Sequence, residues 1–125
     1  MNLFQNGDFI LSSKTKSTWK IDCDALSEDD WLTLSIMAHN IIGNFSLAIG
    51  VPVGGCHLAK KLNSFVAYEG PILICEDVLT TGESMESIKY QLCKSVPESK
   101  VKGITVFARG NPPEWVRPIF QFTGS

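Results

Sequence analysis

Residues 72–84 read ILICEDVLTTGES and decide the fold. The run begins with four apolar residues, continues with two adjacent carboxylates, Glu76 and Asp77, and ends in hydroxyl residues around a glycine. A short apolar run that ends at turn residues predicts a buried strand, and the helical periodicity that follows predicts a helix from Ser84. The stretch therefore predicts a strand, a tight loop and a helix, with acids at the end of the strand.

Predicted strands and helices also alternate along the chain on both sides of this stretch. Apolar runs at residues 45–51 and 104–108 predict two further buried strands. Apolar residues at helical spacing predict helices over residues 27–43, 56–62 and 84–94, the first one beginning at an N-cap serine and stopping at a glycine. Buried strands that alternate with helices indicate an α/β fold with a mostly parallel sheet flanked by helices on both faces.

The two ends of the chain follow another pattern. Residues 8–11 and 18–22 predict two short strands joined by a polar hairpin loop. The proline-rich tail predicts irregular structure, with a last strand at residues 119–122. Because 125 residues are the size of one domain, we expect a single domain, 1–125, with a small hood from residues 1–24 and about 110–125.

One connection does not fit a parallel sheet. Residues 64–68 are a strand candidate, but only residues 69–71 separate them from the strand that begins at Ile72. A parallel crossover needs a dozen or more residues. If residues 64–68 form a strand, the chain must turn back tightly after it.

Composition excludes several classes of function. A net charge of −2, with 44% hydrophobic and 19% charged residues, is typical of a globular protein with no general affinity for nucleic acid or anionic lipid. The four cysteines are widely spaced, which argues against zinc and disulfides and predicts buried thiols. No apolar run approaches the roughly 20 residues of a membrane span, so we expect a soluble, cytoplasmic protein.

The chemistry of residues 72–84 follows from their place in such a sheet. Ligands of parallel sheets bind beyond the carboxyl ends of the strands, where a helix N-terminus offers free N–H groups to a phosphate. Hydroxyls of Thr80, Thr81 and Ser84 add donors, while Glu76 and Asp77 suit the vicinal hydroxyls of a ribose. The run therefore predicts a ribose 5-phosphate clamp.

Other proteins also end an apolar strand in acids. P-loop ATPases do so, but the sequence has no GxxxxGK[ST] run. Phospho-acceptor receiver domains need further acids near their first strand, and Asp22 and Asp24 stand in a different context. The remaining alternative is a strand–turn–helix in which the threonines and the serine only cap.

The same run resembles the phosphoribosyl diphosphate (PRPP) signature of type I phosphoribosyltransferases: four apolar residues, Glu-Asp, two apolar residues, Thr-Thr-Gly, a variable residue and Ser. Within that family two further segments resemble orotate phosphoribosyltransferases. They are residues 7–22, GDFILSSKTKSTWKID, and the loop segment 49–59, IGVPVGGCHLA. The resemblance implies a type I phosphoribosyltransferase-like fold, PRPP or a nucleotide as ligand, orotate as a candidate base, Mg²⁺ bound with PRPP and not at a dedicated protein site, and a homodimer.

The resemblance also implies binding roles for individual residues, and it leaves the catalytic residues unknown. The implied contacts are the ribose for Glu76 and Asp77; the 5-phosphate for Thr80, Thr81, Gly82, Glu83 and Ser84; the diphosphate for the backbone of Val53, Gly54 and Gly55; and the base for Lys16, Trp19 and Arg109. Structural alternatives stay open for the last three: an exposed hairpin lysine, a core tryptophan and a solvated arginine. Apolar dimer surface is expected from Trp31, Trp115 and the hairpin.

Two features depart from the family pattern. The family's long mobile loop, which carries arginine and lysine over the diphosphate, is replaced here by residues 68–70, and no basic residue lies between Lys61 and Lys89. Lys14 stands where the family has glycine. Removing one electrostatic contact to a developing charge typically costs about 3–4 kcal/mol of barrier. Three hypotheses follow: a slow orotate-type transferase, a non-catalytic regulator that binds PRPP or a nucleotide, and a scaffold.

Overall fold

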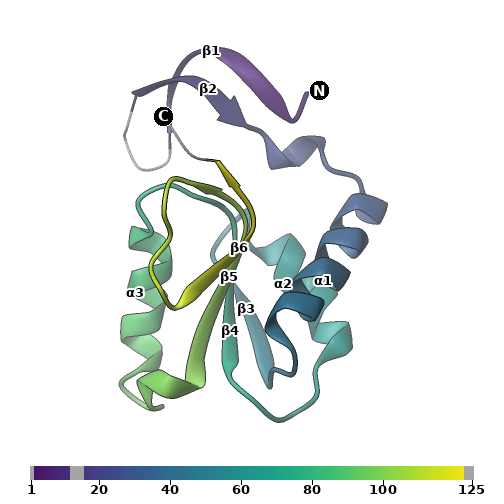
Figure 1. Cartoon of the computed structure of the whole chain (residues 1–125), viewed down its shortest axis with the longest axis vertical. Helices are drawn as coiled ribbons and strands as arrows, with labels where there is room; N and C mark the ends of the chain where they lie inside the picture. Colours follow the sequence, from purple (N-terminus) through teal and green to yellow (C-terminus); the bar gives the residue numbers. More distant parts are fainter. Residues whose placement is uncertain (1, 12–15, 123–125) are drawn as a thin grey trace.

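The computed structural model describes residues 2–11 and 16–122, so the prediction for Lys14 lies outside the described residues. Its main sheet is parallel and its strand order is β3-β4-β5-β6, which places β4 in the interior, as the α/β prediction requires (Figure 1). These strands are β3 (Leu47–Gly50), β4 (Ile72–Leu79), β5 (Val101–Arg109) and β6 (Val116–Phe122).

Helices cover both faces of this sheet (Figure 1). Helices α1 (Glu28–Ile42) and α2 (Cys56–Leu62) bury Trp31, Leu34, Leu58 and Leu62 in the larger core cluster. Helix α3 (Glu83–Leu92) buries Met85 in a smaller core cluster, which also contains Ile74, Val101 and Val116. The parallel α/β architecture with helices on both sides is confirmed.

The start of α1 follows the sequence prediction closely. Ser27 Oγ accepts a hydrogen bond from Asp30 N–H at 3.1 Å, and the Asp30 carboxylate accepts one from Ser27 N–H at 2.9 Å. This capping box satisfies two N–H groups that the first turn leaves without helical partners. Trp31, which we expected to offer dimer surface, is only 3% exposed and stacks on His57. That part of the prediction is wrong, because Trp31 lies on the core face of α1.

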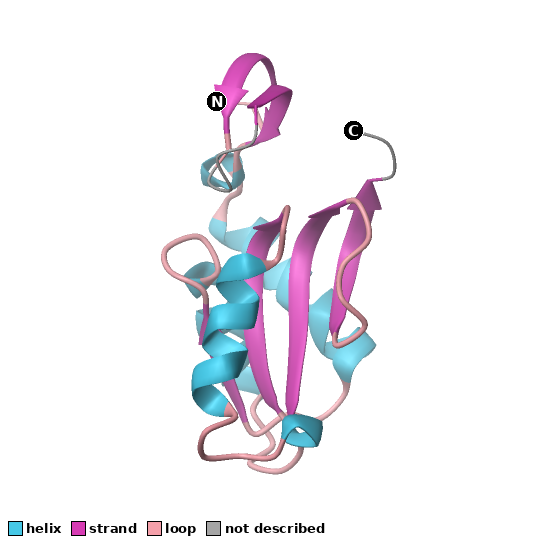
Figure 2. Ribbon diagram, turned by 90° about the vertical axis from the view of Figure 1, so that its left-hand side faces the viewer, coloured by secondary structure: helices cyan, strands magenta, loops and turns pink. Residues whose placement is uncertain are grey.

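An antiparallel hairpin, β1 (Phe4–Ile10) and β2 (Lys16–Ile21), lies beyond the carboxyl ends of the main sheet (Figure 2). The predicted hairpin is confirmed, although β1 starts four residues earlier than the sequence suggests (Phe4 instead of residue 8). Short 3₁₀ turns stand at Cys23–Ala25, Asn63–Phe65 and Glu98–Lys100.

The strand considered for residues 64–68 does not form. The chain makes a 3₁₀ turn at Asn63–Phe65 and then passes the start of β3, where Ala67 N–H donates to the Phe45 carbonyl at 3.1 Å. Helix α2 already provides the crossover from β3 to β4, so no additional strand is needed. The apolar side chains of Phe65 and Val66 pack against the core instead.

The prediction that residues from about 110 onward belong to the hood differs from the structure for residues 116–122. Val116–Phe122 forms the fourth parallel strand, paired with β5. Pro118 is tolerated there because an edge strand leaves one side without ladder bonds. Only the end of β6 reaches the hairpin, through the ring contacts of Phe122 with Phe4 and Trp19 at 5.7 and 5.9 Å.

The cysteines are free thiols, but not all are buried as predicted. Cys23 and Cys75 are buried, Cys93 is half-buried and Cys56 is exposed at the start of α2. Burial and the nearby carboxylates of Asp77 and Asp22 raise the pKa of Cys23 to about 12, so this thiol stays protonated. Among the described residues, no helix has the length and apolar character of a membrane span.

Candidate functional site

Two neighbouring carboxylates stand in the last half of β4. Glu76 and Asp77 are half-buried, and the Asp77 Oδ1 atom accepts from Val78 N–H at 2.7 Å. Thr105, buried on β5, donates to the Asp77 carbonyl at 3.4 Å. Burial, then the side-chain hydrogen bond and the charge of Asp77, raise the pKa of Glu76 to about 8. Glu76 therefore favours its protonated form at neutral pH.

The loop after β3 lies directly against these carboxylates. A Cβ on Gly54 would collide with the Asp77 carboxylate, and one on Gly55 would collide with the Cys75 carbonyl. Only glycine allows the backbone to approach the end of β4 this closely. Val53, at the tip of the loop, is 81% exposed. The structure thus brings the predicted diphosphate loop next to the predicted ribose carboxylates.

The loop after β4 and the start of α3 enclose a small cavity of about 60 Å³. Its lining includes all five residues predicted to hold the 5-phosphate, Thr80, Thr81, Gly82, Glu83 and Ser84, together with Glu76. Gly82 has a φ of +82°, and α3 has no side-chain N-cap there. Glu83 N–H donates to Thr81 Oγ1 at 3.4 Å. The cavity exceeds the roughly 30 Å³ that a water occupies in the liquid, so a small anion can fit at the helix N-terminus.

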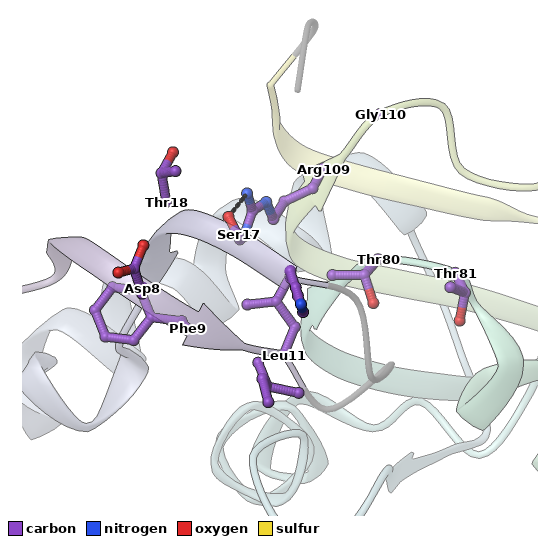
Figure 3. A pocket seen from close by; sticks show the side chains of 11 residues that line it. Asp8, Phe9, Leu11, Ser17, Thr18, Thr80, Thr81, Arg109 and Gly110 are labelled. Atoms are coloured by element: carbon purple, nitrogen blue, oxygen red, sulfur yellow. Dashed lines mark hydrogen bonds between the residues drawn. The ribbon is translucent and has the colours of Figure 1, made fainter.

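A larger cavity of about 980 Å³ lies between the hairpin and the carboxyl ends of β4 and β5 (Figure 3). It is lined from the hairpin by Asp8, Phe9, Ile10, Leu11, Lys16, Ser17 and Thr18, and from the sheet by Thr80, Thr81, Arg109 and Gly110. Thr80 and Thr81 line both cavities, which are therefore neighbours. The predicted base residues Lys16 and Arg109 meet the predicted phosphate residues here.

Trp19 is not among the residues that line this cavity. Its ring lies beneath Arg109, whose guanidinium carbon is 3.6 Å from the ring centroid. Arg109 also donates to Ser17 Oγ at 2.8 Å and to the Trp19 carbonyl at 3.2 Å. Burial lowers the pKa of Arg109. The arginine thus connects the end of β5 to the hairpin, and Trp19 holds it in place.

Sequence reasoning did not identify the apolar wall of the cavity. Phe9, Ile10 and Leu11 line it from the hairpin. A signal was available: Ile10 is an apolar residue at the end of a hairpin strand, and it is 71% exposed in the structure. Ser17, the partner of Arg109, gave no signal of its own, because its role depends on a residue 92 positions away.

The connection between β3 and β4 passes the opposite end of the sheet. Ser46 N–H donates to the Pro71 carbonyl at 2.9 Å, at the amino ends of the two strands. Residues 66–71 are therefore remote from Glu76 and Asp77. Lys61, one of the two lysines nearest the diphosphate loop in sequence, pairs with Glu28 of α1 at 2.7 Å. The ammonium group of Lys61 is therefore directed toward α1.

No protein-family model matches the sequence, and no curated protein matches it. Solved structures do match. Orotate phosphoribosyltransferase from Aeropyrum pernix superposes with a TM-score of 0.75 and 20% identity over 95% of this chain and 88% of that one. The chain has a type I phosphoribosyltransferase fold. Orotate phosphoribosyltransferase from Mycobacterium tuberculosis H37Rv gives a TM-score of 0.68 and 14% identity over 94% and 89% of the two chains.

A purine enzyme of the same fold agrees less well. The xanthine-guanine-hypoxanthine phosphoribosyltransferase of Helicobacter pylori gives a TM-score of 0.54 and 16% identity over 74% of this chain and 89% of that one. The type I phosphoribosyltransferase fold of this chain is thus of the orotate phosphoribosyltransferase kind, as the resemblance of residues 7–22, 49–59 and 72–84 implies. At these identities the likeness concerns the fold.

Proposed function

We propose that this chain is a phosphoribosyltransferase-like protein that binds the ribose 5-phosphate part of PRPP or of a nucleotide. One observation carries the proposal: Glu76 of β4, the loop at residues 80–82 and the N-terminus of α3 line one crevice that adjoins the larger cavity under the hairpin, and the neighbouring Asp77 carboxylate lies against the loop at Gly54. Each of these parts suits one part of a phosphorylated ribose.

The proposed contacts follow the chemistry of each group. Glu76 and Asp77 accept hydrogen bonds from the ribose hydroxyls through their carboxyl oxygens, and Glu76 keeps acceptor capacity when it carries its proton. The backbone N–H groups at the start of α3 and the hydroxyls of Thr80 and Thr81 hold the 5-phosphate. The backbone of residues 53–55 holds a diphosphate when PRPP is the ligand.

Magnesium is the cofactor that this proposal includes for PRPP. The acidic surroundings formed by Glu76 and Asp77 fit a cation that accompanies a diphosphate, and oxygen atoms of phosphates are ligands that Mg²⁺ prefers. Among the described residues, no group of three or more His, Cys, Asp or Glu side chains is placed to hold a metal ion. When bound, Mg²⁺ would offset negative charge on the diphosphate.

The reaction proposed for PRPP is transfer of the phosphoribosyl group to a pyrimidine base such as orotate. A ring nitrogen of the base forms a bond to C1′ of the ribose and gives up its proton, and the diphosphate leaves with the electron pair of the broken C1′–O bond and can accept that proton. Lys16, at the cavity wall, would pair with the carboxylate of orotate. Arg109 and Trp19 would hold the hairpin over the base.

A second candidate is a protein that binds these ligands without transferring the group. It is favoured by the position of residues 66–71 at the amino ends of β3 and β4, where they cannot cover the diphosphate loop. In this case the clamp serves recognition of a phosphorylated ribose and no chemistry follows.

Calorimetric titration with PRPP and Mg²⁺ tests the proposal, and an assay for orotidine monophosphate separates the two candidates. We expect wild-type protein to bind PRPP and Asp77→Asn to bind it at least about tenfold more weakly. Asp29→Asn, on the exposed first turn of α1, is the matched control and should bind as the wild type does. Absence of PRPP and nucleotide binding by the wild type would refute the proposed function.

A further inference from the structure

We propose that the preferred ligand of this site is a nucleoside 5′-monophosphate, bound more tightly than PRPP. This inference rests on the proposed function, because it uses the same ribose 5-phosphate clamp. The two ligands share the ribose and the 5-phosphate. They differ in what C1′ carries: an aromatic base in the nucleotide and a diphosphate in PRPP.

The base side of the crevice is built for an aromatic group. The large cavity is lined from the hairpin by the apolar residues Phe9, Ile10 and Leu11 and from the sheet by Thr80 and Thr81. Ile10 leaves 71% of its surface exposed while lining this cavity. Apolar walls with a few polar groups are typical of small-molecule sites, and an aromatic ring would cover the surface that Ile10 leaves in contact with water.

The basic residues also lie on the base side. Of the residues that line the two cavities, Lys16 and Arg109 are the basic ones, and both line the larger cavity. Arg109 is fixed there by Ser17 and the Trp19 carbonyl. A base with carbonyl oxygens can therefore find hydrogen-bond donors at the wall of the cavity.

On the diphosphate side, the loop at residues 53–55 carries no basic side chain. Gly54 lies against the Asp77 carboxylate, so a diphosphate on this loop would approach a negative charge. Lys61 is paired with Glu28 on α1. Residues 66–71 lie at the other end of the sheet. A diphosphate carries several negative charges, and here it meets backbone dipoles and a carboxylate, whereas a nucleotide places no charge at this position.

The experiment compares ligands that differ by one group at a time. Calorimetric titrations of the wild-type protein use ribose 5-phosphate, PRPP, and three nucleotides: the 5′-monophosphates of orotidine, uridine and adenosine. Each is measured with and without magnesium chloride. We expect at least one nucleotide to bind about tenfold or more tightly than ribose 5-phosphate, without a need for magnesium. Without magnesium, we expect PRPP to bind no more tightly than ribose 5-phosphate. With or without magnesium, we expect PRPP to bind less tightly than the preferred nucleotide.

The outcomes separate this inference from the proposed function. PRPP binding more tightly than all three nucleotides overturns the inference and leaves the proposed function standing. The same holds if no nucleotide binds more tightly than ribose 5-phosphate. If none of the five compounds binds, the proposed function itself fails.

A pair of variants locates the base. Ile10→Ser should weaken the preferred nucleotide about fivefold to tenfold by removing apolar surface, and should leave the affinity for ribose 5-phosphate unchanged. Ile36→Ser, at an exposed isoleucine of α1, is the matched control and should affect neither. An equal loss for nucleotide and ribose 5-phosphate in Ile10→Ser would contradict the placement of the base under the hairpin.

Discussion

The side-chain amide of Asn63 pairs with the backbone of Ala48: it donates to the carbonyl oxygen and accepts from the N–H, each at 2.9 Å. Ala48 belongs to β3, an edge strand of the main sheet. Unpaired backbone groups on an edge strand are a template for pairing with another chain. Asn63 therefore closes the edge of the sheet at the place where the chain continues directly from α2 toward β4.

We expect Asn63→Leu to destabilise the protein, because it leaves the Ala48 N–H and carbonyl without these partners. Loss of such part-buried hydrogen bonds costs about 1–3 kcal/mol. Urea unfolding measures the change, and light scattering should show increased self-association through the opened edge. The control is Asn44→Leu, where the amide makes one exposed 3.3 Å bond to Glu69 and the change should stay within about 0.5 kcal/mol. Equal losses in the two variants would contradict the role of Asn63.

Gly54→Ala should abolish ligand binding with little loss of secondary structure. The added methyl group would collide with the Asp77 carboxylate, so either the loop or Asp77 must move. Both belong to the proposed clamp. Circular dichroism checks the fold, and calorimetry with PRPP or the preferred nucleotide checks binding. Gly43→Ala adds the same methyl group after α1, where no heavy atom lies within 4 Å of it, and should bind normally; normal binding by Gly54→Ala would show that this close approach is dispensable.

Stability should fall as the pH rises toward 8, because Glu76 holds a proton that the unfolded chain releases. Its pKa is raised from 4.5 to about 8 by burial and by Asp77. Between these values the folded state binds more protons than the unfolded state, so the free energy of unfolding decreases with pH, by at most about 1.4 kcal/mol per pH unit. Urea unfolding between about pH 5 and 8 measures this slope. Glu76→Gln stays neutral and should reduce it; an unchanged slope would assign it to other groups.

How much could be predicted from the sequence depends on the range of the interactions involved. The strand at residues 72–75, the helix N-cap Ser27 and the bounds of α2 follow from local periodicity and capping, and the structure confirms them. The start of β6 and its place in the main sheet do not follow in this way: the sequence predicts a strand only at residues 119–122, prolines precede it, and its pairing with β5 is non-local. Arg109 and Ser17 illustrate the same limit within the site.

Arg109→Lys should loosen the hairpin from the sheet. Lysine keeps the charge but loses the planar group that lies over Trp19 and bonds Ser17 and the Trp19 carbonyl. Hydrogen exchange measured by mass spectrometry should show faster exchange in β2, by about tenfold for a loss of about 1.4 kcal/mol. Arg117→Lys, at an exposed arginine of β6, is the control. Unchanged exchange in Arg109→Lys would show that the aromatic contacts of Phe4 and Trp19 with Phe107 and Phe122 hold the hairpin without the arginine.

The last prediction concerns the rate of phosphoribosyl transfer. As the C1′–O bond breaks, negative charge grows on the diphosphate, and positioned cations and exclusion of water lower the barrier. In this structure the connection between β3 and β4 passes the amino ends of the strands, and Lys61 is bound by Glu28. The described residues around the loop at 53–55 therefore supply backbone dipoles, a carboxylate and no closing segment.

We expect purified protein with Mg²⁺, PRPP and orotate to turn over more slowly than about one per second, at the low end of the range for enzymes. Each missing electrostatic contact to the leaving group should cost about a hundredfold to a thousandfold in rate, and magnesium offsets only part of that loss. Steady-state formation of orotidine monophosphate measures the rate, and Asp77→Asn provides the background. A rate of about one per second or faster, abolished in Asp77→Asn, would contradict this prediction. It would mean that backbone dipoles and magnesium are sufficient for transfer, and that the short connection between β3 and β4 lacks nothing that transfer requires.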